Sequence, residues 1–220
     1  DADARHALSF CIPMDTPGLT FICRDSVSVG TNRFEHPLSS RFDEQDAFVI
    51  FDDVEVPRER LFIDANLAAY NSVMKTSWWP NIMQQTMIRA QTKLEFAYGL
   101  ATRMAEAINL GQPQTQQMLG EIAMYAEFAR ATVYAAEQAA REIGNGLWTC
   151  DQRPLVALRA ALPTWFPRVN EIIRLVGSHN LLTTPARAAL ADKKLRPLID
   201  KYLLGVGVDA EQRSRLFRLA

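Results

Sequence analysis

The chain has 220 residues, with 24 Lys or Arg and 25 Asp or Glu, so its formal net charge is −1. This near-neutral balance argues against nucleic acid or an anionic membrane surface as a partner, because both attract strongly basic proteins. The apolar content of 48% is typical of a globular protein and excludes disorder as a description of the whole chain. No signal-peptide pattern and no uninterrupted apolar run of about 18 residues is present, so neither secretion nor a membrane span is expected.

Three cysteines, Cys11, Cys23 and Cys150, lie far apart and form no CxxC pair. An odd number of dispersed cysteines argues against a disulfide framework or a thiolate zinc site and indicates a reducing, cytoplasmic environment. The three histidines are not spaced with a second ligand for a metal ion. The sequence therefore predicts no metal site.

Short apolar runs separated by turn residues predict a small antiparallel β domain at the start of the chain. The runs ALSFCIPM and LTFICR flank a Pro-Gly turn, which predicts a β-hairpin. In AFVIFDDVEVP we expect a buried strand over 47–51, then an alternating edge strand at Val54 and Val56 that Pro57 ends. The polar stretch RFEHPLSSRFDEQD between these regions is expected to be a loop.

After Asp64 the apolar period changes from two to about 3.6 residues, which predicts helices. The first stripe ends before Gly111-Gln112-Pro113 and consists of Met83, Met87, Ala90, Leu94, Ala97, Ala101, Met104 and Ile108. The second ends before Gly144-Asn145-Gly146 and consists of Met118, Ile122, Tyr125, Ala129, Val133, Ala136, Ala140 and Ile143. Two long helices joined by a short turn should pack antiparallel.

A third apolar segment, Leu155–Val176, contains two prolines and should form either two helices or one kinked helix. Shorter helices are expected over 195–204 and 210–219, the latter with a capping box from Asp209 and Gln212. The predicted fold class is mainly helical α+β. Residues 1–64 are assigned to a β domain and residues 65–220 to a helical bundle.

The common catalytic and nucleotide-binding motifs are absent: there is no GxGxxG, Walker-type loop, HExxH or GxSxG. Two segments remain as candidates for ligand binding. In the polar loop, serine hydroxyls and Arg41 suit a phosphate or a flavin edge, although paired serines also serve as turn residues. In LVGSHNLLTTP, the glycine either ends a helix or lets backbone amides approach an anion.

Three segments, in order along nearly the whole chain, resemble the flavin-dependent 4-hydroxyphenylacetate 3-hydroxylase family. They are PLSSRFDEQDAFVIFDDVEVPRERLF, MIRAQTKLEFAYGLATR, and LVGSHNLLTTPARAAL followed by RPLIDKYLLGVGVDAEQRSRLFRLA. More distantly, a polar Arg/Ser stretch followed by a strand, FDDVxVP and a long helix is similar to the acyl-CoA dehydrogenases. The resemblance implies a middle β domain followed by a C-terminal four-helix bundle that forms the core of a homotetramer.

The resemblance also implies an activity. Members of this family are oxygenase components that take reduced FAD from a separate NAD(P)H:flavin reductase and use O2 to place a hydroxyl group ortho to a phenol oxygen. The family pattern implies that this chain begins inside the β domain and stops before the bundle ends. It also implies that the catalytic Arg, Tyr and His come from a preceding helical domain, so we assign no catalytic residue in these 220 residues.

By this resemblance, Ser39, Ser40 and Arg41 are expected near the FAD or a domain interface. An ion pair of Arg41 with Asp43 or Glu44 is an equally weighted alternative.

Gly177, Ser178 and His179 fall where acyl-CoA dehydrogenases carry a Gly-Gly segment that meets the FAD of a neighbouring subunit. Arg89 is a further candidate for a flavin phosphate, with an exposed helix-surface arginine as the alternative. Trp79 is a candidate wall of the substrate pocket, with core packing as its alternative.

Two other functions are weighed against the hydroxylase. A non-catalytic assembly module would use the bundle for oligomerisation and hold no flavin. A 4-hydroxybutyryl-CoA dehydratase-like relative would need Cys and His ligands for an iron-sulfur cluster. It is disfavoured because residues 66–112 contain neither.

Overall fold

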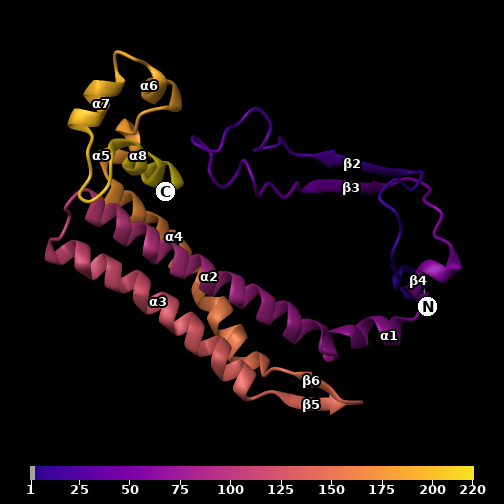
Figure 1. Cartoon of the computed structure of the whole chain (residues 1–220). Helices are drawn as coiled ribbons and strands as arrows, with labels where there is room; N and C mark the ends of the chain where they lie inside the picture. Colours follow the sequence, from indigo (N-terminus) through magenta and orange to yellow (C-terminus); the bar gives the residue numbers. More distant parts are fainter. Residues whose placement is uncertain (1–2) are drawn as a thin grey trace. The chain divides into compact units, whose positions relative to one another are not determined.

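The computed structural model describes residues 3–220, apart from the side chain of Met74 (Figure 1). The chain divides into two compact units. The first contains the chain up to Val27 together with Asp43–Trp79, and the second contains Ser28–Phe42 and Pro80–Ala220. Residues 33–42 of the polar loop thus belong with the helices, whereas residues 43–46 belong with the strands of the first unit. The domain boundary after residue 64 stays a prediction.

The first unit is built from short strands and short helical segments. Its strands are β1 (Ser9–Phe10), β2 (Leu19–Cys23), β3 (Ala47–Phe51) and β4 (Leu61–Ile63). Its helical segments are η1 (Ala4–His6), η2 (Arg58–Arg60), α1 (Leu67–Ser72) and η3 (Val73–Lys75). β1 pairs antiparallel with β4, and β2 pairs antiparallel with β3. The predicted hairpin between the first two apolar runs is therefore wrong.

A close backbone approach at Gly18 explains this pairing. Gly18 has a φ of +87°, and its carbonyl accepts a hydrogen bond from the Asp52 amide at 3.0 Å. A Cβ atom at this position would lie 2.3 Å from the carbonyl oxygen of Asp52. Glycine tolerates both the left-handed conformation and the close approach. The turn therefore places Leu19 opposite Phe51 and pairs β2 with β3.

Strand β3 has the predicted bounds but not the predicted burial. All its residues are exposed in the described part of the chain, and Phe48 is 71% exposed. A continuous apolar run predicts a strand, but it does not reveal whether another layer covers the sheet. The predicted strand at Val54 and Val56 is also absent, because the chain bends at Asp53, whose φ is +52°.

Asp43 makes several hydrogen bonds within the first unit. Its carboxylate, which is 7% exposed, accepts from Arg24 Nη2 at 2.6 Å, from Ser26 Oγ at 2.7 Å and from the Val27 amide at 2.9 Å. These donors, Arg24 foremost, lower the pKa of Asp43 from its ordinary value of 3.8 to about 2. The charged carboxylate therefore stabilises the fold above about pH 3.8, and this contribution is lost as the pH falls through about 2.

Replacing Arg24 by glutamine is expected to raise the pKa of Asp43 back toward 3.8 and to move the loss of this contribution to higher pH. The measurement is a carbon-13 NMR titration of the Asp43 carboxyl group. Arg103→Gln is the control, since Arg103 is exposed and pairs with Glu106 at 2.8 Å on a helix of the other unit. An Asp43 pKa that stays near 2 in Arg24→Gln would contradict the assignment.

The second unit is mainly helical, and Figure 1 shows its three long helices side by side. The long helices are α2 (Trp78–Ala107), α3 (Pro113–Gln138) and α4 (Gln152–Gly177). They are followed by the short helices α5 (His179–Thr183), α6 (Arg187–Ala191), α7 (Arg196–Tyr202) and α8 (Ala210–Leu219). A hairpin of β5 (Arg141–Gly144) and β6 (Leu147–Thr149) lies between α3 and α4 in the sequence.

The apolar stripe predicted for α2 is confirmed, because seven of its eight residues are buried: Met83, Met87, Ala90, Leu94, Ala97, Ala101 and Met104. The predicted antiparallel packing of α2 and α3 is confirmed as well. Gln84 near the start of α2 donates to Glu137 near the end of α3 at 2.8 Å. α4 also packs antiparallel to α3. Arg168 Nη2 of α4 lies 2.9 Å from Glu121 Oε2 of α3, and the rings of Trp165 and Tyr125 stack with their centres 4.7 Å apart.

The end of the second stripe was predicted wrongly. Helix α3 stops at Gln138, and Ile143 lies exposed in β5. The hairpin turn is formed by Asn145 and Gly146, whose φ angles are 53° and 75°. Two successive residues with positive φ are typical of a two-residue hairpin turn, and Asn-Gly is its preferred sequence. Ile143 matched the helical period by coincidence.

The segment with two prolines forms one helix, α4, which contains Pro163 and Pro167. The predicted capping box at the start of α8 is confirmed: Asp209 accepts from the Gln212 amide at 2.7 Å, and Gln212 accepts from the Asp209 amide at 3.0 Å. The predicted fold class, mainly helical with small antiparallel sheets, is confirmed. Among the residues that the structure describes, no helix combines the length and hydropathy required to cross a membrane.

Candidate functional site

The segment Ser28–Phe42, called the docked segment here, is anchored in the helical unit by Phe34. This ring is 7% exposed and packs in a buried cluster with Leu190, Ile199 and Ala210. The guanidinium carbon of Arg215 lies 5.3 Å from the centre of the ring, within reach of a cation–π interaction. An aromatic side chain in a polar loop is thus the main apolar anchor of this segment.

Glu35 adds a polar anchor beside Phe34. Its Oε1 accepts from the Arg187 amide at 2.9 Å, and its Oε2 accepts from Asn32 Nδ2 at 2.5 Å. Asn32 Oδ1 in turn accepts from the amides of Phe34 and Glu35, so the turn is held locally. The Arg187 amide and the Asn32 side chain lower the pKa of Glu35, because both hydrogen bonds favour the charged carboxylate.

Ser39, Ser40 and Arg41 follow in the same docked segment. Ser40 Oγ is buried and has no hydrogen-bond partner among the described residues. Arg41 is exposed and donates from Nε to the Pro37 carbonyl at 3.1 Å. Its guanidinium carbon lies 5.0 Å from the centre of the Phe42 ring. Among the described residues Arg41 forms no ion pair with Asp43 or Glu44, which was its alternative, and Asp43 binds Arg24.

Gly177 ends α4 at a point where there is no room for a side chain. A Cβ atom there would lie 2.5 Å from Leu181 Cγ and 2.9 Å from Met104 Cε. The next residue, Ser178, has a φ of +48°, and its amide donates to the Arg174 carbonyl at 2.8 Å. Because that amide is used inside the protein, the geometry favours packing at Gly177 over an anion cradle of backbone amides.

Ser178 and His179 are exposed and line a hollow at the end of the bundle, which we call the bundle-end hollow. It has a volume of about 570 Å³, within the range of small-molecule sites. Its other polar lining residues are Asn180, Tyr202 and Arg213, and the remaining lining residues are apolar. The structure therefore brings two of the predicted cofactor residues together with three residues that were not predicted.

Arg213 of α8 is the charged residue of this hollow. It donates from Nη2 to Asn180 Oδ1 at 2.6 Å and from Nη1 to the Leu203 carbonyl at 3.1 Å. Its Nε is buried without a partner among the described residues, and its guanidinium carbon lies 5.7 Å from the centre of the Phe217 ring. Burial lowers the pKa of Arg213, although an arginine remains charged near neutral pH.

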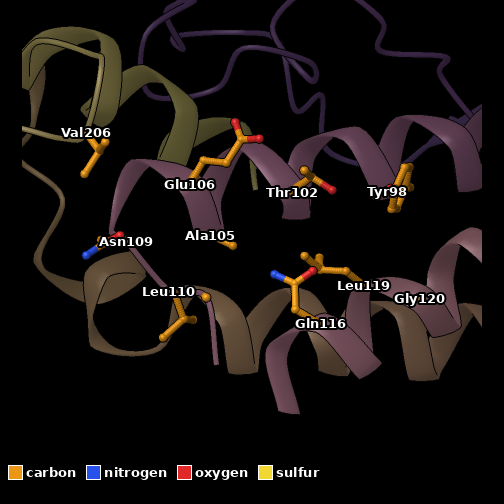
Figure 2. A pocket seen from close by; sticks show the side chains of 11 residues that line it. Tyr98, Thr102, Ala105, Glu106, Asn109, Leu110, Gln116, Leu119, Gly120 and Val206 are labelled. Carbon is orange, nitrogen blue, oxygen red and sulfur yellow. The ribbon is translucent and has the colours of Figure 1, made fainter. Parts of the chain in front are cut away.

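A second cavity of about 530 Å³ lies between α2 and α3 near the same end of the bundle (Figure 2). Thr102 of α2 and Gln116 of α3 contribute polar groups to it, and Thr102 Oγ1 is buried without a partner in the described part of the chain. None of the predicted site residues lines this cavity.

Two predicted site residues lie apart from both cavities. Arg89 is exposed on α2, which matches its alternative as a surface arginine. Trp79 is half-buried near the start of α2 and lines neither cavity. Sequence reasoning missed Phe34 and Arg213, since an aromatic residue in a loop and an arginine near Glu211 have no distinctive local pattern.

Two family models match the chain. One is described as 4-hydroxyphenylacetate 3-hydroxylase N terminal and matches residues 1–63, and the other is described as 4-hydroxyphenylacetate 3-hydroxylase C terminal and matches residues 69–220. Together they include all three segments on which the resemblance was based.

Curated relatives agree with these models. The oxygenase component of 4-hydroxyphenylacetate 3-monooxygenase from Thermus thermophilus is 38% identical over 98% of this chain and 45% of its own length. The oxygenase component of 4-nitrophenol 2-monooxygenase from Rhodococcus sp. is 32% identical over 98% of this chain and 43% of its own length. The chain thus spans a little under half the length of these relatives.

Solved structures show the same relationship. The oxygenase component of 4-hydroxyphenylacetate 3-monooxygenase complexed with FAD has a TM-score of 0.92 and 37% identity over 99% of this chain and 46% of that one. An oxygen-tolerant archaeal 4-hydroxybutyryl-CoA dehydratase from N. maritimus has a TM-score of 0.84 at 19% identity, over 99% of this chain and 44% of that one, and this match shows the fold alone. Because the C-terminal model alone matches more than half of the residues, the chain belongs to the 4-hydroxyphenylacetate 3-hydroxylase family.

Proposed function

We propose that the chain is part of the oxygenase component of a two-component, FADH2-dependent aromatic hydroxylase that adds a hydroxyl group ortho to a phenol oxygen. The main support is the match over nearly the whole chain to an oxygenase component whose structure contains FAD. Relatives named for 4-hydroxyphenylacetate and for 4-nitrophenol support a small phenol as the substrate class.

The described residues fit a flavin cofactor in two respects. Ser40 Oγ is a buried polar atom without a partner among the residues that the structure describes, and Ser178, His179 and Arg213 present donors at the bundle-end hollow. Phosphate groups and flavin edges accept such hydrogen bonds. When reduced FAD is bound, it supplies the two electrons with which one atom of O2 enters the ring as hydroxyl and the other leaves as water.

The residues of this chain are proposed to bind the flavin and to position it. The proton transfers are assigned to residues outside the chain. Ser39, Ser40 and Arg41 form one donor set, held on the helical unit by the Phe34 anchor. Ser178 and His179 form a second set at the bundle end, where Gly177 keeps α4 and α5 close together.

Arg89 is also proposed as a contact to a flavin phosphate, and Trp79 as a wall of the substrate pocket. Both stand on the family resemblance.

The proposed partners are an NAD(P)H:flavin reductase and further copies of the chain in a homotetramer. The name "oxygenase component" of the relatives supports a separate reductase. Exposed apolar residues on the long helices support self-association: Ile88, Phe96, Met124, Phe128 and Val156. A cytoplasmic location is proposed because all three cysteines are free, with Cys150 buried and Cys11 and Cys23 exposed.

The proposal is tested by flavin binding and turnover. We expect reduced FAD to bind the whole product of the gene, and a flavin reductase with NAD(P)H to support conversion of 4-hydroxyphenylacetate into its 3-hydroxy product. The 220-residue chain is measured in parallel by absorbance after gel filtration. Flavin bound to neither protein would contradict the hydroxylase and favour the assembly module. Flavin binding without hydroxylation of any phenol would contradict the proposed reaction alone.

A further inference from the structure

The charges of the chain are divided unequally between its two units. The first unit holds 12 acidic and 5 basic residues, a formal net charge of −7, and the second holds 13 acidic and 19 basic residues, a net charge of +6. The net charge of −1 for the whole chain conceals this difference. Because surfaces of opposite charge attract each other, the first unit of one copy of the chain is electrostatically complementary to the second unit of another copy.

In the first unit, one face of the ribbon formed by β2 and β3 combines apolar and acidic side chains (Figure 1). Alternate residues of a strand share a face, so the side of β3 that carries Phe48 and Ile50 continues to Asp46 at one end and Asp52 at the other. Ile22 of β2 lies opposite Phe48 and extends the apolar centre. Phe48 is 71% exposed and Ile22 is 58% exposed. These five residues are called the ribbon face here.

The two aspartates of the ribbon face are available to a partner. The side chain of Asp46 is 92% exposed, and its carboxylate lies 3.7 Å from Arg24 Nε, which is too far for a hydrogen bond. Arg24 binds Asp43 at 2.6 Å instead. Asp52 is exposed and forms no ion pair within the described part of the chain.

In the second unit, α7 carries a face with the same pattern and the opposite charge. Leu198 and Tyr202 are four residues apart, so they are neighbours on one side of the helix, and they are 54% and 68% exposed. Lys201 is three residues from Leu198 on the same side, and Lys194 precedes the helix. These four residues are called the α7 face here.

The lysines of the α7 face have no counter-charge of their own. Both are exposed, and neither pairs with a carboxylate among the residues that the structure describes. The nearby carboxylate of Asp200 does not neutralise them, because it binds Arg196 at 2.8 Å. The positive charge of the α7 face is therefore available to a partner.

The ribbon face and the α7 face complement each other. Each has large exposed apolar side chains in its centre, a feature that marks interaction surfaces. A two-stranded ribbon is only marginally stable until its apolar side is packed. Like charges would repel if either face met a second copy of itself, whereas the aspartates of the ribbon face attract the lysines of the α7 face.

We propose that two copies of the chain form a dimer in which the ribbon face of each copy binds the α7 face of the other. The apolar centres pack against each other, and the aspartates of one copy pair with the lysines of its partner. The two contacts are equivalent and close around a twofold axis, so the dimer does not extend into a filament. This interface goes beyond the proposed function, because it requires no flavin and uses neither the flavin candidates nor the exposed residues of the long helices.

Charge reversal tests the interface by sedimentation velocity of the 220-residue chain in the micromolar range. One double variant carries Asp46→Lys and Asp52→Lys, and the other carries Lys194→Glu and Lys201→Glu. Each variant alone should associate about tenfold to a hundredfold more weakly than the unmodified chain, because like charges then meet at both contacts. An equal mixture of the two should restore association, since the reversed face of each variant meets the oppositely reversed face of the other.

The matched control is Lys75→Glu combined with Lys93→Glu, which reverses two exposed charges outside both faces and should leave association unchanged. Three results would each overturn the proposal: a chain that stays monomeric, a reversed variant that associates as tightly as the unmodified chain, or a mixture that fails to restore association.

Cross-linking of the unmodified chain provides a second measurement that needs no substitution. A carbodiimide joins a carboxylate directly to a lysine amine that is in contact with it. In an equal mixture of nitrogen-15-labelled and unlabelled chains, we expect Asp46 or Asp52 to be joined to Lys194 or Lys201 between one labelled and one unlabelled peptide. Association without these cross-links, or cross-links confined to peptides of the same label, would contradict the proposed dimer.

Discussion

Phe34→Ala is expected to release the docked segment Ser28–Phe42 from the helical unit. The ring is 7% exposed and fills a cluster with Leu190, Ile199 and Ala210, so its removal leaves a cavity that these residues cannot fill. Truncation of a buried phenylalanine costs about 3–5 kcal/mol, which exceeds what the polar contacts of Glu35 can replace. We therefore expect the segment to open locally while α2, α3 and α4 remain folded.

Hydrogen–deuterium exchange measures this effect directly. The amides of Phe34 and Glu35, which bond to Asn32, should lose protection in Phe34→Ala and keep most of it in Phe34→Leu. Phe42→Ala is the matched control in the same segment, because Phe42 is 67% exposed and should change protection little. Equal exchange in the two alanine variants would mean that Phe34 does not anchor the segment.

Gly177→Ala is expected to lower the free energy of unfolding of the helical unit by about 1–3 kcal/mol, the usual cost of overpacking. The added Cβ would lie 2.5 Å from Leu181 Cγ and 2.9 Å from Met104 Cε, so both side chains or α5 must shift. The gain in helix propensity from alanine, about 1 kcal/mol, opposes this cost and does not exceed it.

Gly99→Ala provides the matched comparison. Gly99 lies exposed within α2, and a Cβ there would meet nothing within 4 Å. Its replacement should raise the free energy of unfolding by about 0.8–1 kcal/mol, so the two substitutions have opposite signs. Urea unfolding followed by circular dichroism at the helical band measures both. If Gly177→Ala is as stabilising as Gly99→Ala, close packing is not the reason for this glycine.

The long helices were predictable because their signal is local. Residues that share a helix face recur every three or four positions, and the stripe from Met83 to Met104 is buried as that period predicts. The capping box at Asp209 is local for the same reason, since both of its hydrogen bonds join residues three apart. The period failed where the chain left α3, because Ile143 matched it without being in a helix, while Asn145-Gly146 was the signal for the hairpin.

The pairing of the strands could not be predicted from local sequence signals. Whether β2 pairs with β1 or with β3 depends on the approach of Gly18 to Asp52, residues that are far apart in the sequence. The exposure of β3 likewise depends on what covers the sheet, which an apolar run does not specify. Both errors concern contacts between distant residues.

The sequence by itself determined the helical period, the capping signals and the family, and through the family it singled out the segments Ser39–Arg41 and Gly177–His179. Only the tertiary structure decided that Phe34 anchors the first segment and that Arg213 lines the bundle-end hollow beside the second. The physical reason is that periodicity and capping arise from neighbours within one turn, whereas a buried anchor or an uncompensated charge is defined by residues that folding brings together. Arg213 illustrates this, since Glu211 lies two positions away in the sequence but binds Arg196 and Arg215 instead.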